Sequence, residues 1–400
     1  IRTKAHPLVL PPAPAAGDAA GLEVWGASLG PALDAYAAAY RACFDRQNAL
    51  VGGIKTPLDP LPRVVAIPGL GLVGIGKSAA DAAVTADIAE TWATTLLAAE
   101  SIGRFSPVDE ADTFAMEYWS LEQAKLGKAS EKPLARSVVV ITGGAGAIGA
   151  ATARAFAARG ADLAVLDLDG EAAAAVARGC GGRALGLACD VTDPEAVRRA
   201  FAAVAERFGG LDIVVSNAGA AWSGRMAELS DTDLRASFEL NFFAHQHVAQ
   251  AALALFRAQD TLSAAAAQTA GEGGRLGGQL LFNVSKQALN PGPGFGAYGT
   301  SKAALLALVR QYALEEGAAG IRVNAINADR IRSGLLTDAM IRERSAARGL
   351  SEADYMGGNL LGAEVRAEDV AEAFVALAQL DRTTGALLTV DGGNVAAMVR

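Results

Sequence analysis

The chain has 400 residues, of which 52% are hydrophobic and 20% charged, so it can form two or three packed domains and is not a disordered chain. Its net charge of −8 argues against a nucleic-acid partner. Three cysteines without paired or metal-ligand spacing favour a reducing, cytoplasmic location, and no apolar run reaches the ~18 residues of a membrane span. The sequence starts without a methionine and shows no signal peptide, so we expect it to be part of a longer protein.

The first 133 residues predict a small unit of helices and short strands. Residues 1–20 are rich in proline and alanine, which favours an extended arm. Ser78 is followed three residues later by Asp81, a pattern typical of a helix N-cap. The remaining pattern predicts helices at 31–50, 79–100 and 109–126, strands at 63–67 and 72–76, and a polar linker at 127–136.

A phosphate-binding pattern overlaps the second of these strands. Gly71, Gly76, Lys77 and Ser78 have the spacing of the Walker A loop. However, the residues between the two glycines are mostly apolar and typical of a strand interior, and no later strand before the linker ends in a magnesium-binding aspartate. We therefore interpret this segment as a hairpin that runs into a capped helix.

From residue 134 onward, apolar strands alternate with helical patterns, which predicts an α/β domain built on a doubly wound parallel sheet. We place the domain boundary between 1–133 and 134–400, and we expect 259–278, which are of low complexity, to form a surface insertion. Strands are expected at 138–142, 162–167, 184–188, 212–216, 279–284, 321–326 and 386–390. Helices are expected near 147–159, 171–178, 194–208, 231–258, 297–317 and 367–380.

The first of these strands leads into a glycine-rich turn and a helix. Its core, Val138–Ile141, is a β-branched run typical of a strand buried on both faces. The glycines that follow have the G-x-G-x-x-G spacing that ends at Gly149, and Asp167 closes the next strand 18 residues later. A strand, a glycine turn, a helix start and an acid in this order predict a dinucleotide site, with the phosphates at the helix N-terminus.

Tyr298 and Lys302 are four residues apart in a helical pattern and therefore lie on one helix face. A lysine ammonium near a phenol stabilises the phenolate and lowers its pKa from ~10, which gives a proton acceptor that works near neutrality. A solvated pair on an exposed helix face would have the same spacing, so the surrounding motifs must decide between the two interpretations.

Together with further motifs in order, these features make residues 134–400 similar to the short-chain dehydrogenase/reductase family. The matching segments are its TGxxx[AG]xG turn at 142–149, the acidic segment Asp190-Val191, the NAG motif Asn217-Ala218-Gly219, the helix asparagine Asn241, the YxxxK pair Tyr298 and Lys302, and the closing VDGG at 390–393. The resemblance implies a Rossmann-type oxidoreductase. Its implied cofactor contacts are Gly143, Ala147, Ile148, Gly149, Asp167, Asp190, Val191, Asn217, Ala218, Gly219, Tyr298, Lys302 and Ser333.

The resemblance also implies a catalytic set of Asn241, Ser285, Tyr298 and Lys302, in which the phenol takes the substrate proton while a hydride leaves for the nicotinamide. The serine is placed by its distance of 13 residues before the tyrosine; counting from the FNVSK segment lands instead on Lys286, and both registers stay open. The Pro-Gly that usually follows the sixth strand is replaced by Ala328-Asp329, which puts the contacts to the nicotinamide face in doubt.

The predicted cofactor is NAD. Asp167 accepts from a ribose 2′-hydroxyl and repels a 2′-phosphate, and the residue after it is Leu168 rather than an arginine. We expect no metal, because His245 and His247 are two apart on a helix and face different directions, without further ligands nearby.

The N-terminal part resembles the end of the class II aldolase/adducin fold, in the stretch from RVVAIPG to LLAAE, so the fold is expected to include a partial α+β aldolase-like piece. An aldolase half ahead of this type of dehydrogenase is similar to the bifunctional rhamnulose-1-phosphate aldolase/lactaldehyde dehydrogenase family. Family aldolases bind zinc through several histidines, and only His6 precedes the linker, so we expect no aldolase activity from this chain.

This second resemblance implies a small hydroxyaldehyde such as lactaldehyde as substrate, oxidised as its hydrate without a cysteine nucleophile, and a homodimer or homotetramer paired through the helices at 231–258 and 297–317. Two alternatives stay open. One is a sugar or secondary-alcohol dehydrogenase, and the other is an NAD-binding redox sensor without turnover. We expect residues 220–226 and 330–360 to line the substrate pocket, which no sequence rule decodes.

Overall fold

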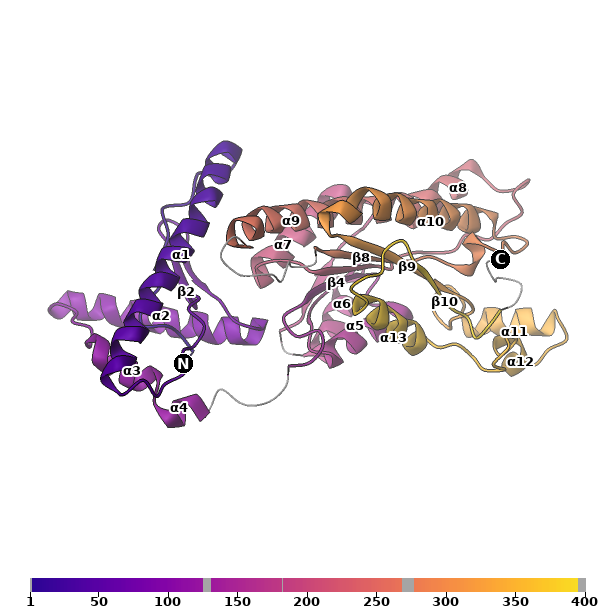
Figure 1. Cartoon of the computed structure of the whole chain (residues 1–400). Coiled ribbons are helices and arrows are strands. Elements are labelled where there is room, and N and C mark those ends of the chain that lie inside the picture. The colour runs from indigo at the N-terminus through magenta and orange to yellow at the C-terminus, as the bar shows by residue number, and fades with distance from the viewer. Residues whose placement is uncertain (1, 125–130, 182, 268–276, 395–400) are drawn as a thin grey trace. The chain divides into compact units, whose positions relative to one another are not determined.

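The computed structural model describes all residues except 1, 125–130, 182, 268–276 and 395–400 (Figure 1). Its described residues fall into two compact units, one within Ile1–Glu131 and Asp260–Gly274 and the other within Lys132–Gln259 and Arg275–Arg400. No helix in the described part of the chain is both long and apolar enough to cross a membrane. The two units are described separately below.

The first unit is a three-stranded sheet with helices packed on it. Its strands β1 (Leu8–Val9), β2 (Val64–Ile67) and β3 (Gly71–Gly74) lie in the order β1-β2-β3, and its helices are α1 (Ala19–Leu50), α2 (Ala79–Ile102), α3 (Glu110–Glu117) and α4 (Ser120–Ala124). The predicted extended arm at 1–20 is therefore partly wrong, because β1 pairs in parallel with β2. The helix predicted at 31–50 also starts earlier, where the Asp18 carboxylate accepts the N–H of Gly21 at 2.8 Å.

The Walker-like segment is a hairpin and a helix cap, as predicted. β2 and β3 pair antiparallel, with Val65 opposite Val73, and β3 ends before the glycine–lysine–serine triplet. The Ser78 hydroxyl accepts the N–H of Asp81 at 3.2 Å and so caps α2. The helix predicted at 109–126 divides into α3 and α4, because the chain leaves the helix at Tyr118, whose ring packs on Phe44 and Phe114.

The second unit confirms the predicted doubly wound Rossmann sheet. Seven parallel strands lie in the order β10-β9-β8-β7-β4-β5-β6. They are β4 (Val138–Thr142), β5 (Asp162–Asp167), β6 (Leu185–Ala188), β7 (Ile213–Ser216), β8 (Gln279–Asn283), β9 (Arg322–Ala328) and β10 (Leu387–Val390). The apolar run of β4 is central and buried at every position, as its β-branched sequence predicts.

Helices cover both faces of this sheet (Figure 1). One face packs on α5 (Ala147–Ala158), α6 (Gly170–Cys180) and α13 (Ala367–Ala378), with Phe156 and Phe374 fully buried. The other face packs on α7 (Pro194–Phe208), α9 (Ala244–Ala267) and α10 (Gly296–Glu316), with Phe201, Phe256 and Phe282 in the core. Two apolar layers therefore hold the carboxyl ends of the strands in place.

Three details differ from the predicted elements. The helix expected at 231–258 is interrupted, with α8 (Asp231–Phe238) followed by one π-helical turn (Glu239–Phe243) before α9. α9 continues to Ala267, into the stretch predicted as a surface insertion, and 268–276 lie outside the described residues. Two further helices, α11 (Asp338–Ala346) and α12 (Glu352–Met356), lie in the segment after β9.

Candidate active site

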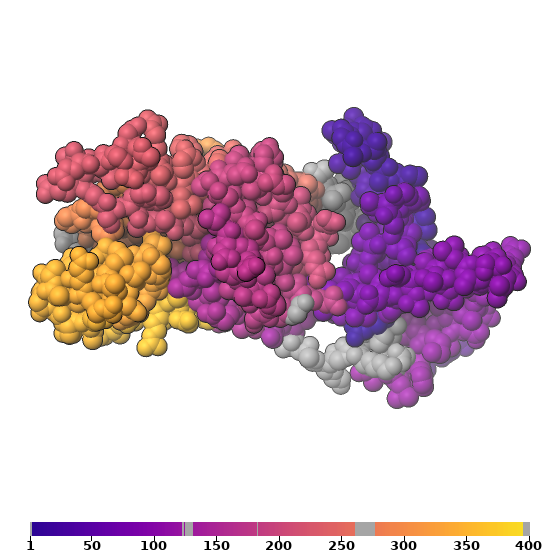
Figure 2. All heavy atoms as spheres, turned by 180° about the vertical axis from the view of Figure 1, so that it is seen from behind, coloured from indigo at the N-terminus to yellow at the C-terminus, as the bar shows by residue number. Residues whose placement is uncertain are grey.

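The chain leaves β4 toward β5 and β6 on one side and later returns to β7 on the other side. Such a reversal leaves a crevice at the carboxyl ends of the strands, where open parallel sheets bind their ligands. A cleft of about 1170 Å³ opens there, lined by residues that follow six of the seven strands. In Figure 2, residues near 220–240 (salmon) and residues from about 340 onward (yellow) form two adjoining lobes of this unit, and both contribute to the lining.

The glycine turn after β4 forms one wall of the cleft. Gly143 has a φ of +59°, and a Cβ there would lie 2.8 Å from the Cα of Ala218. A Cβ on Gly149 would lie 2.2 Å from the Gly143 carbonyl oxygen, so this glycine brings α5 against the turn and is not itself part of the cleft lining. The N–H groups of Ala147 and Ile148, in the first turn of α5, line the cleft without an acceptor among the described residues, which is the arrangement that binds a phosphate.

Asp167 and Asp190 lie at the next part of the cleft, after β5 and β6. The carboxylate of Asp167 accepts the N–H of Ala145 at 2.9 Å and that of Asp169 at 3.2 Å, which fixes its orientation. Each carboxylate oxygen keeps a lone pair for a further donor such as a ribose hydroxyl. The described cationic side chains of the cleft come from residues 286, 302, 330, 344 and 348, and none comes from this acidic region.

Asn217 joins the glycine turn to β8. Its side-chain amide donates to the carbonyls of Thr142 and Gly143, both at 3.1 Å, and its oxygen accepts from Asn283 at 2.8 Å. The first residues after β4, β7 and β8 are therefore connected by hydrogen bonds. Asn217, Ala218 and Gly219 all line the cleft.

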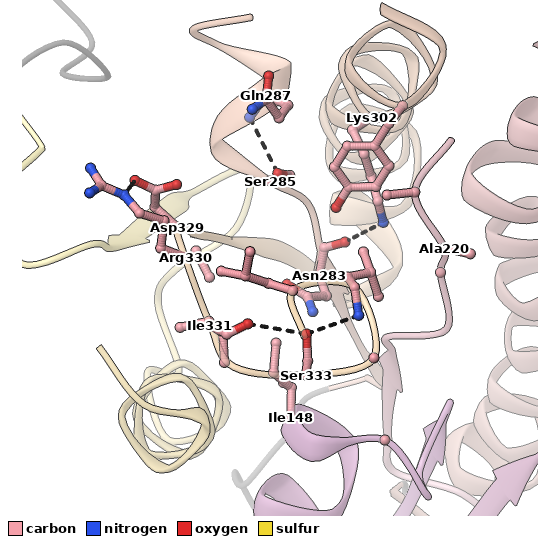
Figure 3. A pocket seen from close by; sticks show the side chains of 18 of the residues that line it. Ile148, Ala220, Asn283, Ser285, Gln287, Lys302, Asp329, Arg330, Ile331 and Ser333 are labelled. Carbon is pink, nitrogen blue, oxygen red and sulfur yellow. Dashed lines mark hydrogen bonds and ion pairs between the residues drawn. The ribbon is translucent and has the colours of Figure 1, made fainter. Parts of the chain in front are cut away.

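Ser285, Tyr298 and Lys302 meet in the same cleft. Figure 3 shows Ser285 and Lys302 on one side of it, with Ile148 and Ser333 facing them. The amine of Lys302 donates to the Asn283 carbonyl at 2.8 Å and lies 6.0 Å from the centre of the Tyr298 ring. The Ser285 hydroxyl lowers the pKa of the phenol, whereas Lys286 forms an ion pair with Asp329 at 3.3 Å. The geometry thus favours the serine register over the lysine register.

The pKa of Tyr298 shifts in the direction opposite to the one expected from its pairing with Lys302. Burial raises the pKa of the Tyr298 phenol, and the hydrogen bond from Ser285 opposes that rise only in part. Burial also lowers the pKa of Lys302 to about 7. The expectation that the ammonium lowers the phenol pKa does not hold in the protein alone, because the loss of water outweighs an amine that does not contact the phenol oxygen.

Asn241 is fully buried in the π-helical turn and does not line the cleft. Its side-chain oxygen accepts the N–H of Ala220 at 3.2 Å, and its amide donates to the Ala220 carbonyl at 2.8 Å. It therefore fixes the chain that follows β7. A Cβ on Gly219 would touch both the Asn241 oxygen, at 2.9 Å, and the Lys302 amine, at 3.5 Å, so asparagine and lysine approach each other there.

His245 is the neighbour of Lys302 that the sequence analysis considered only as a metal ligand. It is buried, with Nδ1 2.6 Å from the Ser216 hydroxyl and Nε2 3.5 Å from the Lys302 amine. Burial and the nearby lysine hold the pKa of His245 well below its usual value, so the imidazole is neutral. No group of three or more histidine, cysteine or acidic side chains placed to hold a metal occurs among the described residues.

The comparison with known proteins identifies the second unit. Residues 137–343 match the short chain dehydrogenase family. The chain belongs to this family. Family members are oxidoreductases that bind NAD(P) and act on small molecules, and the chain is an enzyme of this class. Residues 1–126 match the family described as aldolase class II, second domain, which confirms the resemblance of the N-terminal unit.

Some relatives of this dehydrogenase match nearly the whole chain, and others match about two thirds of it. The uncharacterized oxidoreductase YuxG of Bacillus subtilis is 34% identical over 382 residues, which are 92% of this chain and 53% of YuxG, so the chain spans about half the length of that relative. The 4-formylbenzenesulfonate dehydrogenase of Comamonas testosteroni is 34% identical over 65% of this chain and 98% of its own.

Two solved structures each align with about two thirds of this chain. A short-chain dehydrogenase/reductase of Mycobacterium marinum is 28% identical, with a TM-score of 0.55 over 64% of this chain and 94% of its own. A 3-ketoacyl-(acyl-carrier-protein) reductase of Brucella melitensis, solved as a complex with NADH, is 25% identical, with a TM-score of 0.55 over 64% of this chain and 97% of its own.

The lining of the cleft includes residues from both segments expected to form the substrate pocket, 220–226 and 330–360, and Arg344, Arg348 and Tyr355 belong to the second. Sequence reasoning missed Phe295, which lines the cleft from a segment without a motif, and His245, which lies behind Lys302. His245 lies four residues after Asn241, and this spacing was a usable signal.

Proposed function

We propose that this dehydrogenase oxidises a small alcohol, or the hydrate of a small hydroxyaldehyde such as lactaldehyde, with NAD as the hydride acceptor. The observation that carries the proposal is the meeting of Ser285, Tyr298 and Lys302 in one cleft with the glycine turn after β4. When bound, NAD supplies an electrophilic carbon that accepts the hydride and is recovered as NADH.

The residues present fit this cofactor. The unpaired N–H groups of Ala147 and Ile148 would bind the pyrophosphate, and Asp167 would accept from the ribose 2′-hydroxyl. The absence of described cations around Asp167 supports NAD over NADP, because a 2′-phosphate would meet a carboxylate without a compensating charge. In its protonated form the Lys302 amine has three donors and uses one on Asn283 and one toward His245, so this form has one left for the ribose next to the nicotinamide.

The proton is handled by the tyrosine and serine. The Ser285 hydroxyl and the Tyr298 oxygen would bind the substrate oxygen, and the phenolate would take the hydroxyl proton as the C–H electron pair leaves as hydride. The substrate C–O bond becomes a carbonyl, and a hydrate becomes a carboxylic acid in the same step. A positive charge at Lys302 favours the phenolate electrostatically, and the neutral His245 holds the amine in position.

Two relatives support a range of carbonyl and alcohol substrates. One is named for a formyl compound, 4-formylbenzenesulfonate, and another, from Mentha piperita, for the alcohols isopiperitenol and carveol. The matched aldolase second domain at 1–126 supports a hydroxyaldehyde of the kind that an aldolase releases. We further propose a cytoplasmic homodimer or homotetramer, assembled through α9 and α10, with its domain boundary near residue 133.

The test is turnover and dinucleotide binding of Tyr298→Phe beside the unchanged protein. We expect the variant to lose at least about 100-fold in kcat while its Kd for NADH changes little, because only the phenol oxygen is removed. Absorbance of the reduced nicotinamide follows turnover on lactaldehyde, sugars and secondary alcohols, and fluorescence titration follows binding. Binding without turnover on any of these compounds by the unchanged protein would favour a redox sensor and overturn the proposal.

A further inference from the structure

Charge is distributed unevenly along the cleft. The region after β5 and β6 presents the carboxylates of Asp167 and Asp190. The region formed by the segment after β9, together with α11 and the residues that follow it, presents three arginines: Arg330, Arg344 and Arg348. These two regions of the cleft therefore present opposite charges.

Two of these arginines have no carboxylate partner in the described part of the chain. The third, Arg330, forms an ion pair with Asp329 at 3.2 Å, and the same carboxylate also pairs with Lys286 at 3.3 Å. Arg344 instead lies over the ring of Phe295, with its guanidinium carbon 4.8 Å from the ring centre. Arg348 lies 5.4 Å from the ring centre of Tyr355 and donates to the Arg344 carbonyl at 2.9 Å.

Aromatic rings and a carbonyl hold these guanidinium groups without neutralising them. Tyr355 has Arg330 on its ring as well, at 5.5 Å, so two positive groups share one ring. Like charges placed together repel, and the repulsion is relieved when an anion binds between them. Besides Asp329, Asp354 lines this region, and its carboxylate accepts from the hydroxyl of Ser351, the N-cap of α12, at 2.6 Å.

The two arginines line the same cleft as Tyr298. Phe295, which holds the guanidinium of Arg344, is the N-cap of α10 and precedes Tyr298 by three residues, so both side chains come from the same end of this helix. An anion bound by the arginines would therefore share the cleft with the phenol.

We propose that Arg344 and Arg348 bind an anionic group of the substrate, a carboxylate or a phosphate. The planar, permanently charged guanidinium binds either group through paired hydrogen bonds. The inference rests on the proposed oxidation and narrows its substrate class to hydroxy acids and phosphorylated alcohols or aldehydes, in place of neutral compounds such as lactaldehyde. A neutral compound of the same skeleton would leave the two arginines without an anion.

Matched substrate pairs test this inference. The carboxylate pair is 3-hydroxybutyrate and 1,3-butanediol, and the phosphate pair is glyceraldehyde 3-phosphate and glyceraldehyde. We expect kcat/KM to favour the anionic member, and Arg344→Met with Arg348→Met to lower the anionic-to-neutral ratio by about 10- to 100-fold, mainly through KM. The pair with the larger effect identifies carboxylate or phosphate. Arg342→Met is the matched control, because this arginine is exposed on the same helix and does not line the cleft.

The outcomes separate this inference from the proposed function. An unchanged ratio in the double variant, or a neutral member preferred by the unchanged protein, overturns the anion site. A change in the KM for NAD of the same size as that for the substrate also overturns it, because the arginines would then bind the cofactor. If the unchanged protein turns over neither pair, calorimetric titration of 3-hydroxybutyrate and of inorganic phosphate into the NADH complex decides. Binding that is lost in the double variant supports the anion site, and no binding refutes it. The oxidation proposal itself fails only with the wider set of compounds named above.

Discussion

The buried amine of Lys302 should make the dehydrogenase unit less stable at neutral pH than at alkaline pH. Burial lowers the pKa of Lys302 from 10.5 to about 7. Between these values the unfolded chain holds a proton on this amine and the folded chain does not, so folding becomes more favourable as the pH rises through this window. Lys302→Met keeps the chain length and removes the titrating group.

The magnitude follows from the pKa. At 1.36 kcal/mol for each pKa unit, the ionisation costs the folded state on the order of 4 kcal/mol at pH 7. The variant also loses the hydrogen bond from Lys302 to the Asn283 carbonyl, worth about 1 kcal/mol. We therefore expect Lys302→Met to be more stable than the unchanged protein by about 3 kcal/mol at pH 7, and slightly less stable near pH 10.5.

The assay must report on the second unit alone, because a chain of two units does not unfold in one step. Cys189 is 4% exposed in that unit, so its alkylation across a urea series, identified by mass spectrometry, gives the unfolding midpoint. Lys132→Met, at an exposed position of the same unit, is the control. A stability difference between Lys302→Met and the unchanged protein that stays constant from pH 7 to pH 10 would refute the reasoning.

Four other substitutions test the cofactor wall and the choice between Ser285 and Lys286. Asp167→Asn removes the charge that opposes a 2′-phosphate and should lower the preference for NAD over NADP in kcat/KM by about 10- to 100-fold; an unchanged preference would contradict this role. Gly143→Ala places a Cβ 2.8 Å from the Cα of Ala218 at a φ of +59°, so we expect a loss of about 2 kcal/mol in unfolding free energy and weaker NADH binding by fluorescence titration. Ser285→Ala should lower kcat by about 100-fold, and Lys286→Met much less; the opposite order would assign the substrate contact to Lys286.

The fold of the second unit was predictable because its strands carry their own signal. Runs such as Val138–Ile141 are β-branched and apolar throughout, which only a strand buried on both faces accommodates. The shared helix face of Tyr298 and Lys302 was predictable for a related reason. Two residues four apart in a helix lie on one face whatever packs around them. These features depend on neighbours in the sequence.

Other features depend on contacts distant in the sequence and were missed or misjudged. The direction of the Tyr298 pKa follows from how completely the fold excludes water, which no spacing reveals. The segment at 330–360 lines the cleft as expected, but the sequence did not single out Arg344 and Arg348 in it, because their positions depend on packing against Phe295 and Tyr355. The helix that carries Arg344 did have a local signal, because Thr337 accepts the N–H three residues later in the usual manner of an N-cap.

The π-helical turn at Glu239–Phe243 determines what the loss of one residue from this part of the sequence would do. A π turn holds one residue more than a regular turn, so shortening it by one residue returns the helix to regular spacing while α8 and α9 keep their own faces. The packing on either side would survive, and the displaced group would be Asn241, with its two bonds to Ala220. A one-residue deletion in this turn would leave the fold intact but would displace Asn241 from the active site. In an alignment of homologous sequences, a gap at this position would therefore indicate a changed active site rather than a changed fold.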